Sequence, residues 1–138
     1  MSSSLAARGS AVFQYPGSTS LTAQDWSQSR GLLLAADANG NLTVNASTTV
    51  PAAAIVLDGQ VASKPSSIGL IEGLPFMVFV KLSGTVAPFS RIQQAADGGV
   101  IADAGAGNAR VVIGRLGDQG GVAGDLVPAV LEGGNILA

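Results

Sequence analysis

Few residues of this 138-residue chain could do acid–base, nucleophilic or metal chemistry. The chain has no Cys and no His, so thiolate and imidazole nucleophiles, general bases and metal ligands are all missing. Carboxylates, lysines, hydroxyls and a single tyrosine remain. A disulfide framework is also excluded, and the redox compartment leaves no trace in the sequence.

Two pairs of acids could in principle serve a hydrolase that works with two carboxylates: Asp97 with Asp103, and Asp118 with Asp125. Asp97 precedes Gly98, and Asp118 lies in an Asp-Gln-Gly run. In such contexts the carboxylate accepts hydrogen bonds from nearby backbone N–H groups and shapes a turn. We therefore predict that the chain has no catalytic residue and is not an enzyme.

Three short motifs have part of the pattern of a metal or cofactor site. Asp37, Asn39 and Asn41 alternate like the start of a calcium loop, but the downstream Glu of that loop is missing. The glycine-rich stretch 105–110 carries Arg where a dinucleotide fingerprint needs its third Gly, and stretch 117–124 lacks the Lys-Ser or Lys-Thr of a P-loop. These patterns predict turns and loops, with no metal, no cofactor and no small-molecule substrate.

The charge balance limits the classes of partner. Seven basic and nine acidic residues give a net charge of -2, which provides no electrostatic footprint for nucleic acid. The longest apolar runs are far shorter than the roughly 20 residues of a membrane-spanning helix, so no membrane partner is expected. Only 12% of residues are charged while 47% are hydrophobic. This composition favours a surface that protein partners partly cover, the alternative being a surface coated with Ser, Thr, Gln and Asn.

Residues 1–30 differ from the rest of the chain because they are rich in Ser and poor in large apolar groups. We interpret them as an N-terminal extended arm that precedes a β-rich domain at 31–138. The arm contains the candidate partner-binding residues Val12, Phe13, Tyr15 and Trp26. Two interpretations stay open: an irregular surface segment whose aromatics tuck under the body, or an arm that orders on a neighbouring subunit with the aromatics as anchors.

From residue 31 onward, short apolar runs are separated by turn residues at intervals of about ten, which predicts an all-β fold, a small β-sandwich or β-barrel. Asn39-Gly40 and Asp97-Gly98-Gly99 predict two hairpins because their residues readily adopt positive φ. Pro128 interrupts the last apolar run and lacks an N–H, so we expect an edge strand or a bulge there. The expected strands are 32–36, 42–45, 53–61, 68–74, 76–82, 91–96, 100–103, 111–113 and 126–131.

The run 76–82 is apolar on both sides of a strand. Alternation places Phe76 and Val78 on one face and Met77 and Phe79 on the other. A strand with two apolar faces is expected to be central in its sheet or to lie at an interface. Met77 and Phe79 therefore complete the set of candidate partner-binding residues.

The order of motifs over about three quarters of the chain resembles the small head-decoration, or capsid cement, proteins of tailed bacteriophages. The phrases that carry the resemblance are glycine-rich strand and turn units, with Val112-Ile113-Gly114-Arg115-Leu116 and Gly124-Asp125-Leu126-Val127 fitting a recurrent pattern of that family. Where the family usually has Gly before the strand that follows the loop, this chain has Pro88-Phe89-Ser90. The other phrases lie at 32–41, 55–59, 78–86 and 94–100.

The resemblance implies a non-enzymatic β-rich protein that forms a homotrimer. Such a protein is expected in the virion, on the outer surface of the capsid, after assembly in the host cytoplasm. Its partner would be the major capsid protein, and its function would be to bridge coat subunits and stabilise the expanded head.

Two alternative functions remain open on the sequence. One is a phage tail or fibre module, which would share the β-rich, glycine-rich composition. The other is a carbohydrate-binding β-sandwich, in which Trp26, Tyr15 and Asp37 would form a sugar platform.

Overall fold

A computed structural model describes residues 12–14, 28–58, 67–71 and 76–138, and within these residues it contains ten β-strands and no helix. No helix in this part of the chain could therefore span a membrane. The all-β class predicted from the sequence is confirmed. The strands are β1 (Val12–Gln14), β2 (Leu33–Ala36), β3 (Leu42–Val44), β4 (Ala54–Asp58), β5 (Ser67–Leu70), β6 (Phe76–Lys81), β7 (Arg91–Gln94), β8 (Val100–Ala102), β9 (Arg110–Leu116) and β10 (Leu126–Leu137).

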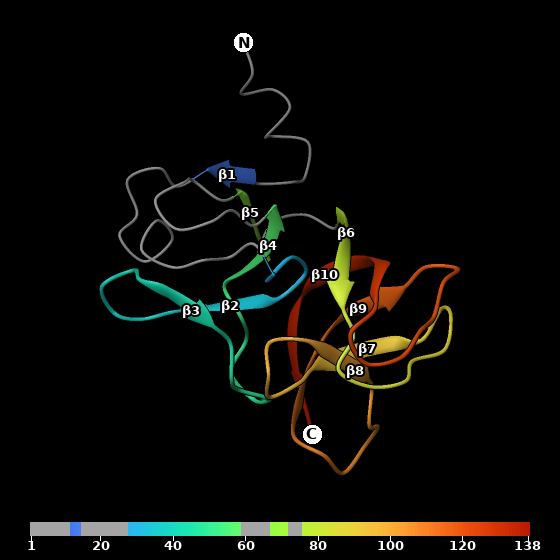
Figure 1. Cartoon of the computed structure of the whole chain (residues 1–138). Helices are drawn as coiled ribbons and strands as arrows, with labels where there is room; N and C mark the ends of the chain where they lie inside the picture. Colours follow the sequence, from blue (N-terminus) through green and yellow to red (C-terminus); the bar gives the residue numbers. More distant parts are fainter. Residues whose placement is uncertain (1–11, 15–27, 59–66, 72–75) are drawn as a thin grey trace.

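The strands form two antiparallel sheets (Figure 1). Sheet A has the order β1-β5-β4-β2-β3, and sheet B has the order β6-β10-β9-β7-β8. Neither sheet closes on itself as a barrel. Of the two predicted architectures, the small β-sandwich is the one that forms.

Both predicted hairpins are present. β2 and β3 are joined by the turn 37–41, in which the Gly40 N–H donates to the Asp37 carbonyl at 3.0 Å. β7 and β8 are joined through Gly98, whose φ of 86° lies in the region that glycine adopts without strain. These turns fix the registers of the two hairpins.

The main core lies between the sheets. Leu33 and Ile55 of sheet A meet Val80, Ile113 and Leu131 of sheet B, and all five are fully buried. The next residues along β2 and β4 point to the opposite face of sheet A, as the twofold alternation of a strand requires. There they form a second buried cluster, with the members Leu34, Leu42, Ala54, Val56 and Ile68.

Two expectations about strand position each named two alternatives, and one alternative of each is wrong: the central position for β6 and the edge position for β10. The interface alternative for β6 stays a prediction. β6 is not central but lies at an edge of sheet B, paired only with β10 among the described strands. β10 is not an edge strand, because it lies between β6 and β9. Pro128 fits at this central position because its carbonyl accepts a hydrogen bond from the Gly117 N–H at 3.0 Å, just past the end of β9. Its missing N–H faces the same side, where β9 has ended, so no ladder bond is lost.

Phe89 lies in the turn before β7, where the resemblance to decoration proteins leads us to expect glycine. Its φ is 61°, and it is the only residue other than glycine with a positive φ in the described part of the chain. Its N–H donates to the Gly117 carbonyl at 2.9 Å, which holds the turn. The chain therefore keeps a glycine-like backbone while displaying an aromatic side chain that is 65% exposed.

A buried amide joins the sheets. Gln94 at the end of β7 is fully buried, and its Oε1 accepts the Ala52 N–H at 2.7 Å. Its Nε2 donates to the carbonyls of Ser47 and Val50 at 3.0 and 2.9 Å. All three partners lie in the segment that leads from β3 to β4, so one side chain of sheet B satisfies three backbone groups beside sheet A.

We predict that Gln94→Leu lowers the free energy of unfolding by about 3 kcal/mol, because it leaves the buried Ala52 N–H without a partner, at about 1–3 kcal/mol, and removes two part-buried bonds to the Ser47 and Val50 carbonyls, at about 0.5–1.5 kcal/mol each. Urea unfolding measures the change. Gln119→Leu, on an exposed loop, is the control and should change stability by less than about 0.5 kcal/mol. Equal stability of the Gln94 variant and the wild type would show that the amide does not hold the sheets together.

Candidate interaction surface

The alternating oxygens of Asp37, Asn39 and Asn41 build the β2–β3 turn. Asp37 Oδ1 accepts the N–H groups of Asn39 and Asn41, both at 2.9 Å, and Oδ2 accepts the Asn41 side-chain amide at 3.3 Å. The backbone bond from Asn41 is the main cause that lowers the pKa of Asp37. The described residues contain no group of three or more acids that could hold a metal ion.

The two acids of the first candidate pair each have a structural partner. Asp97 accepts the hydroxyl of Ser83 and the Gly99 N–H, and the bond from Ser83 is the main cause that lowers its pKa. Asp103 accepts the side chain of Arg110 and the Gly105 N–H. Both carboxylates are therefore stabilised in the ionised form, which a general acid cannot use.

Asp125 of the second pair and Arg110 of the glycine-rich stretch also serve the fold. Asp125 accepts the Val122 N–H at 2.9 Å within its own loop. Arg110, which occupies the place of the third glycine in the dinucleotide pattern, is 5% exposed and donates to Asp103 and to the Asn108 carbonyl. The turn interpretation of these motifs accounts for every bond that Asp125 and Arg110 show.

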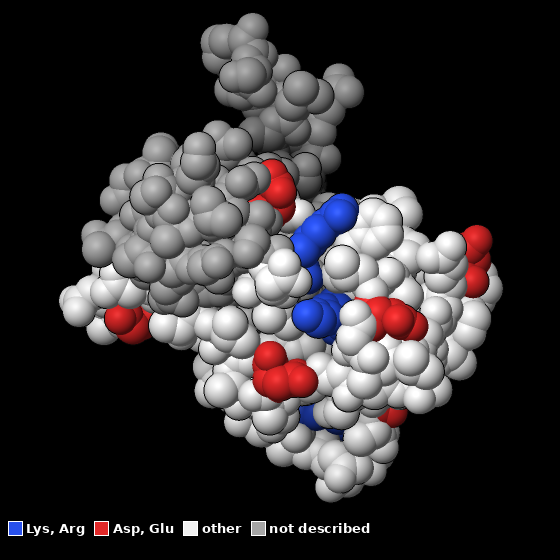
Figure 2. Space-filling model, viewed as in Figure 1, with Lys and Arg blue, Asp and Glu red and all other residues white. Residues whose placement is uncertain are grey.

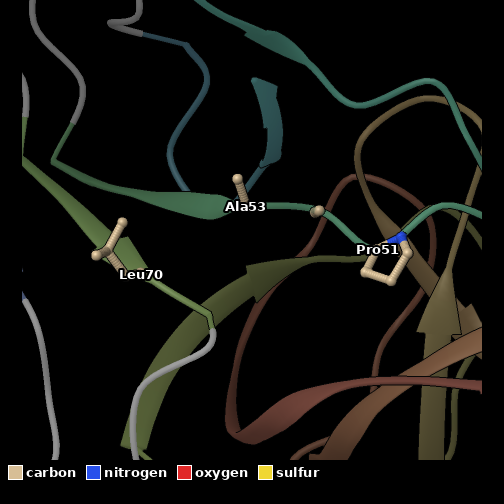
Figure 3. A pocket seen from close by; sticks show the side chains of 4 residues that line it. Pro51, Ala53 and Leu70 are labelled. Atoms are coloured by element: carbon tan, nitrogen blue, oxygen red, sulfur yellow. The ribbon is translucent and has the colours of Figure 1, made fainter. Parts of the chain in front are cut away.

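A hollow of about 310 Å³ lies beside sheet A. It is lined by Pro51, Ala52, Ala53 and Leu70 (Figure 3). These described side chains are all apolar, so they offer no polar side-chain group that could bind or transform a polar substrate.

The outer face of sheet B is the more distinctive surface. We use this name for the side of β6, β10 and β9 that points away from the core. Met77 and Phe79 lie on it and are 74% and 43% exposed, while Val80 of the same strand is fully buried. β10 contributes Pro128 and Val130, which stand directly opposite Phe79 and Met77 in the ladder and are partly exposed. The four side chains form one apolar strip across two strands.

Basic groups surround this strip. The Arg30 guanidinium lies 5.0 Å from the centre of the Phe79 ring, a cation–π contact. Lys81 follows Phe79 on the same side of β6, and Arg115 of β9 stands opposite Val130. Arg115 donates to the Phe89 carbonyl at 3.2 Å.

Of the six residues predicted to bind a partner, the structure brings Met77 and Phe79 together on this face. Val12 and Phe13 belong to β1, whose backbone pairs with β5 of the same chain, opposite Gly69 and Ile68. Tyr15 and Trp26 lie outside the described residues, and so does most of the proposed sugar platform. The partner-binding role of all six residues stays a prediction.

The residues that complete the face were not recognised in the sequence. An edge strand or a bulge was expected at Pro128, and Val130, Arg115 and Phe89 were given no partner-binding role. The alternation of Leu126, Pro128 and Val130 with buried Val127 and Ala129 was the signal that could have found the β10 half. Arg115 of β9 joins this face only because β9 pairs with β10, and the order of strands in a sheet cannot be read from the local sequence pattern.

The similarity of this chain to known proteins is a similarity of fold. No family model and no curated protein matches the chain. A solved structure, the N base of the head fiber gp8.5 of bacteriophage phi29, is similar with a TM-score of 0.58 and 12% sequence identity. The match covers 89% of this chain and 94% of that one. The two chains therefore share a fold over nearly their whole lengths.

We predict that Asp103→Asn lowers stability by about 3 kcal/mol at pH 7, because it leaves the buried Arg110 guanidinium without its carboxylate. The bond from Arg110 is the main cause that lowers the pKa of Asp103 in the folded state below its ordinary value. Its stabilising effect is therefore complete above the pKa of the unfolded state and is lost as the pH falls through the pKa of the folded state.

Chemical denaturation between pH 7 and pH 2 tests this, with Asp118→Asn on an exposed loop as the control. The Asp103 variant should lose less stability on acidification than the wild type. Parallel stability curves for the two proteins would contradict the predicted linkage.

Proposed function

We propose that the chain is a structural protein of a phage virion that binds the outer surface of the head and bridges coat subunits as a homotrimer. The observation that carries the proposal is the fold shared with a phage head-fiber base over 89% of the chain. That likeness is independent of the motif order that resembles head-decoration proteins, because sequence identity is only 12%.

The surface supports a binding role over a catalytic one. On the face shown in Figure 2, charged side chains are few; several basic and acidic ones lie near one another at the centre, and most of the described surface around them is uncharged. Asp37, Asp97, Asp103 and Asp125 all accept hydrogen bonds within their own turns and loops. A surface of this kind gains free energy by burying apolar area against protein neighbours.

Trimer formation would strengthen modest contacts. Three copies held by their own interface engage several coat subunits at once, so each later contact forms at a high effective concentration. Closed rotational symmetry also limits the assembly to a defined size. Bridging in this way stabilises the shell without a deep pocket.

The second candidate is a fibre module that stands on the head and carries further domains. The solved neighbour favours it, because that structure is the base of a head fiber. Cryo-microscopy of the virion separates the two candidates, since a cement protein lies flat between coat subunits and a fibre base continues outward.

We expect the isolated protein to sediment at equilibrium with about three times its chain mass of 13.6 kDa at micromolar concentration. It should also bind purified empty heads of the phage that encodes it, and not purified tails. A protein found on tails alone would contradict the head assignment. A monomer in solution that still binds heads would restrict the trimer to the capsid surface.

A further inference from the structure

Two rows of residues cross the outer face of sheet B at right angles to its strands. The first row consists of Met77 on β6, Val130 on β10, Arg115 on β9 and Arg91 on β7, each standing opposite the next in the ladder. Residues directly opposite each other share a face of the sheet. This row therefore changes from apolar to cationic across four strands.

The second row is apolar along its length. It consists of Phe79 on β6 and Pro128 on β10, and the backbone of Gly117 and Phe89 continues the same registers just beyond β9 and β7. Gly117 has no side chain, so none rises from the surface between Pro128 and Phe89. The positive φ of Phe89 costs about 1–3 kcal/mol for a bulky residue, and its ring is left 65% exposed. Strain that displays an apolar ring to solvent indicates a contact outside the chain.

The two arginines of the first row repel each other, and of the two only Arg91 has a described acidic side chain within ion-pair distance. Arg91 and Arg115 stand directly opposite each other, an arrangement that disfavours the sheet. Arg91 lies 3.6 Å from Asp103, but Asp103 also accepts the buried Arg110. With Arg30 and Lys81 near Phe79, basic groups outnumber acidic ones around the strip, although exposed Glu132 follows Val130 on the same side of β10.

Charge complementarity indicates which partner fits. A surface with an apolar centre and carboxylates opposite Arg115 and Arg91 would bury the strip and relieve the repulsion between the two guanidiniums. A second copy of this chain is the weaker source of those carboxylates, because four of the seven acids in the described residues, Asp37, Asp97, Asp103 and Asp125, accept hydrogen bonds within their own fold. The charge pattern therefore favours a different protein as the partner, and a second copy is one of the outcomes that the test separates.

We propose that the outer face of sheet B is the docking surface for a coat subunit, whose complementary patch has an apolar centre and carboxylates at its rim. This rests on the proposed function, since the coat subunit is the partner which that function requires. Met77, Phe79 and Phe89 supply the apolar contacts, and Arg115 supplies the charge that sets the orientation.

The test measures binding of wild-type and variant proteins to empty heads that lack the protein. Met77→Asp should weaken binding about 30-fold, as expected when an interface anchor becomes charged. The matched control is Val50→Asp, because Val50 is 62% exposed and lies beside sheet A, and it should bind within about twofold of the wild type. Thermal unfolding of each free variant verifies that its fold is intact.

Charge is tested separately at Arg115. Arg115→Glu should weaken binding about tenfold, with a larger loss at low ionic strength, whereas Arg115→Lys keeps most of the affinity. A steeper salt dependence for the wild type than for Arg115→Glu is the signature of a carboxylate partner.

The outcomes distinguish this inference from the function on which it rests. Wild-type binding together with unchanged binding of Met77→Asp and Arg115→Glu would overturn the docking face and leave the proposed function standing. If these two variants bind heads normally but lose their trimeric mass, the face joins copies of this chain and the coat assignment is wrong. A wild-type protein that does not bind heads would overturn both.

Discussion

The buried amide of Gln94 is the side-chain contact that sets the position of the two sheets relative to each other. An apolar core between two sheets favours burial but permits sliding, because dispersion and hydrophobic contacts have little directionality. Three hydrogen bonds from one fully buried side chain remove that freedom, since any shift leaves a polar group without a partner. The segment 47–52 is fixed to the end of β7, and β4 continues directly from that segment. The position of sheet A over the core is therefore held by this side chain together with backbone bonds, from the Leu33 N–H to the Gly98 carbonyl at 2.7 Å and from the Val111 N–H to the Thr48 carbonyl at 3.1 Å.

Fixing the sheets also fixes which side of sheet B faces solvent. Val127, Ala129 and Leu131 of β10 enter the core, so the residues between them must lie on the outer face. The apolar strip is thus made by the same strand that fills the core. Its side chains extend from a paired strand of the sandwich and not from a loop, so little ordering of the backbone is needed when a partner binds. A register slip of one residue in β10 would destroy core and surface together.

The sequence was sufficient for features that depend on neighbouring residues. Alternation at Phe76 to Lys81 and the Asn-Gly and Asp-Gly turns predicted the all-β class, both hairpins and the placement of Met77 and Phe79 on one face of their strand. Features that depend on distant pairing were not accessible. The missing N–H of Pro128 suggested an edge because a single strand does not reveal where its neighbour ends. Likewise Arg115 and Arg91 look unrelated in the sequence, although the β7–β9 register places them side by side. No local signal marked Gln94 as the link between the sheets.

The distribution of charge separates the stability of this protein from its capacity to bind. Most acids in the described part of the chain accept hydrogen bonds from nearby backbone N–H groups. One of them, Asp103, also forms an ion pair with the buried Arg110. The cations of the outer face contribute little to the fold, since Lys81, Arg30 and Arg115 lie at exposed or partly exposed positions where ion pairs add at most about 1 kcal/mol. A chain with few charged residues has therefore placed its acids where they shape the backbone and left several of its bases on one apolar face. Such a division is costly for solubility, and it becomes favourable when a carboxylate-bearing surface covers that face.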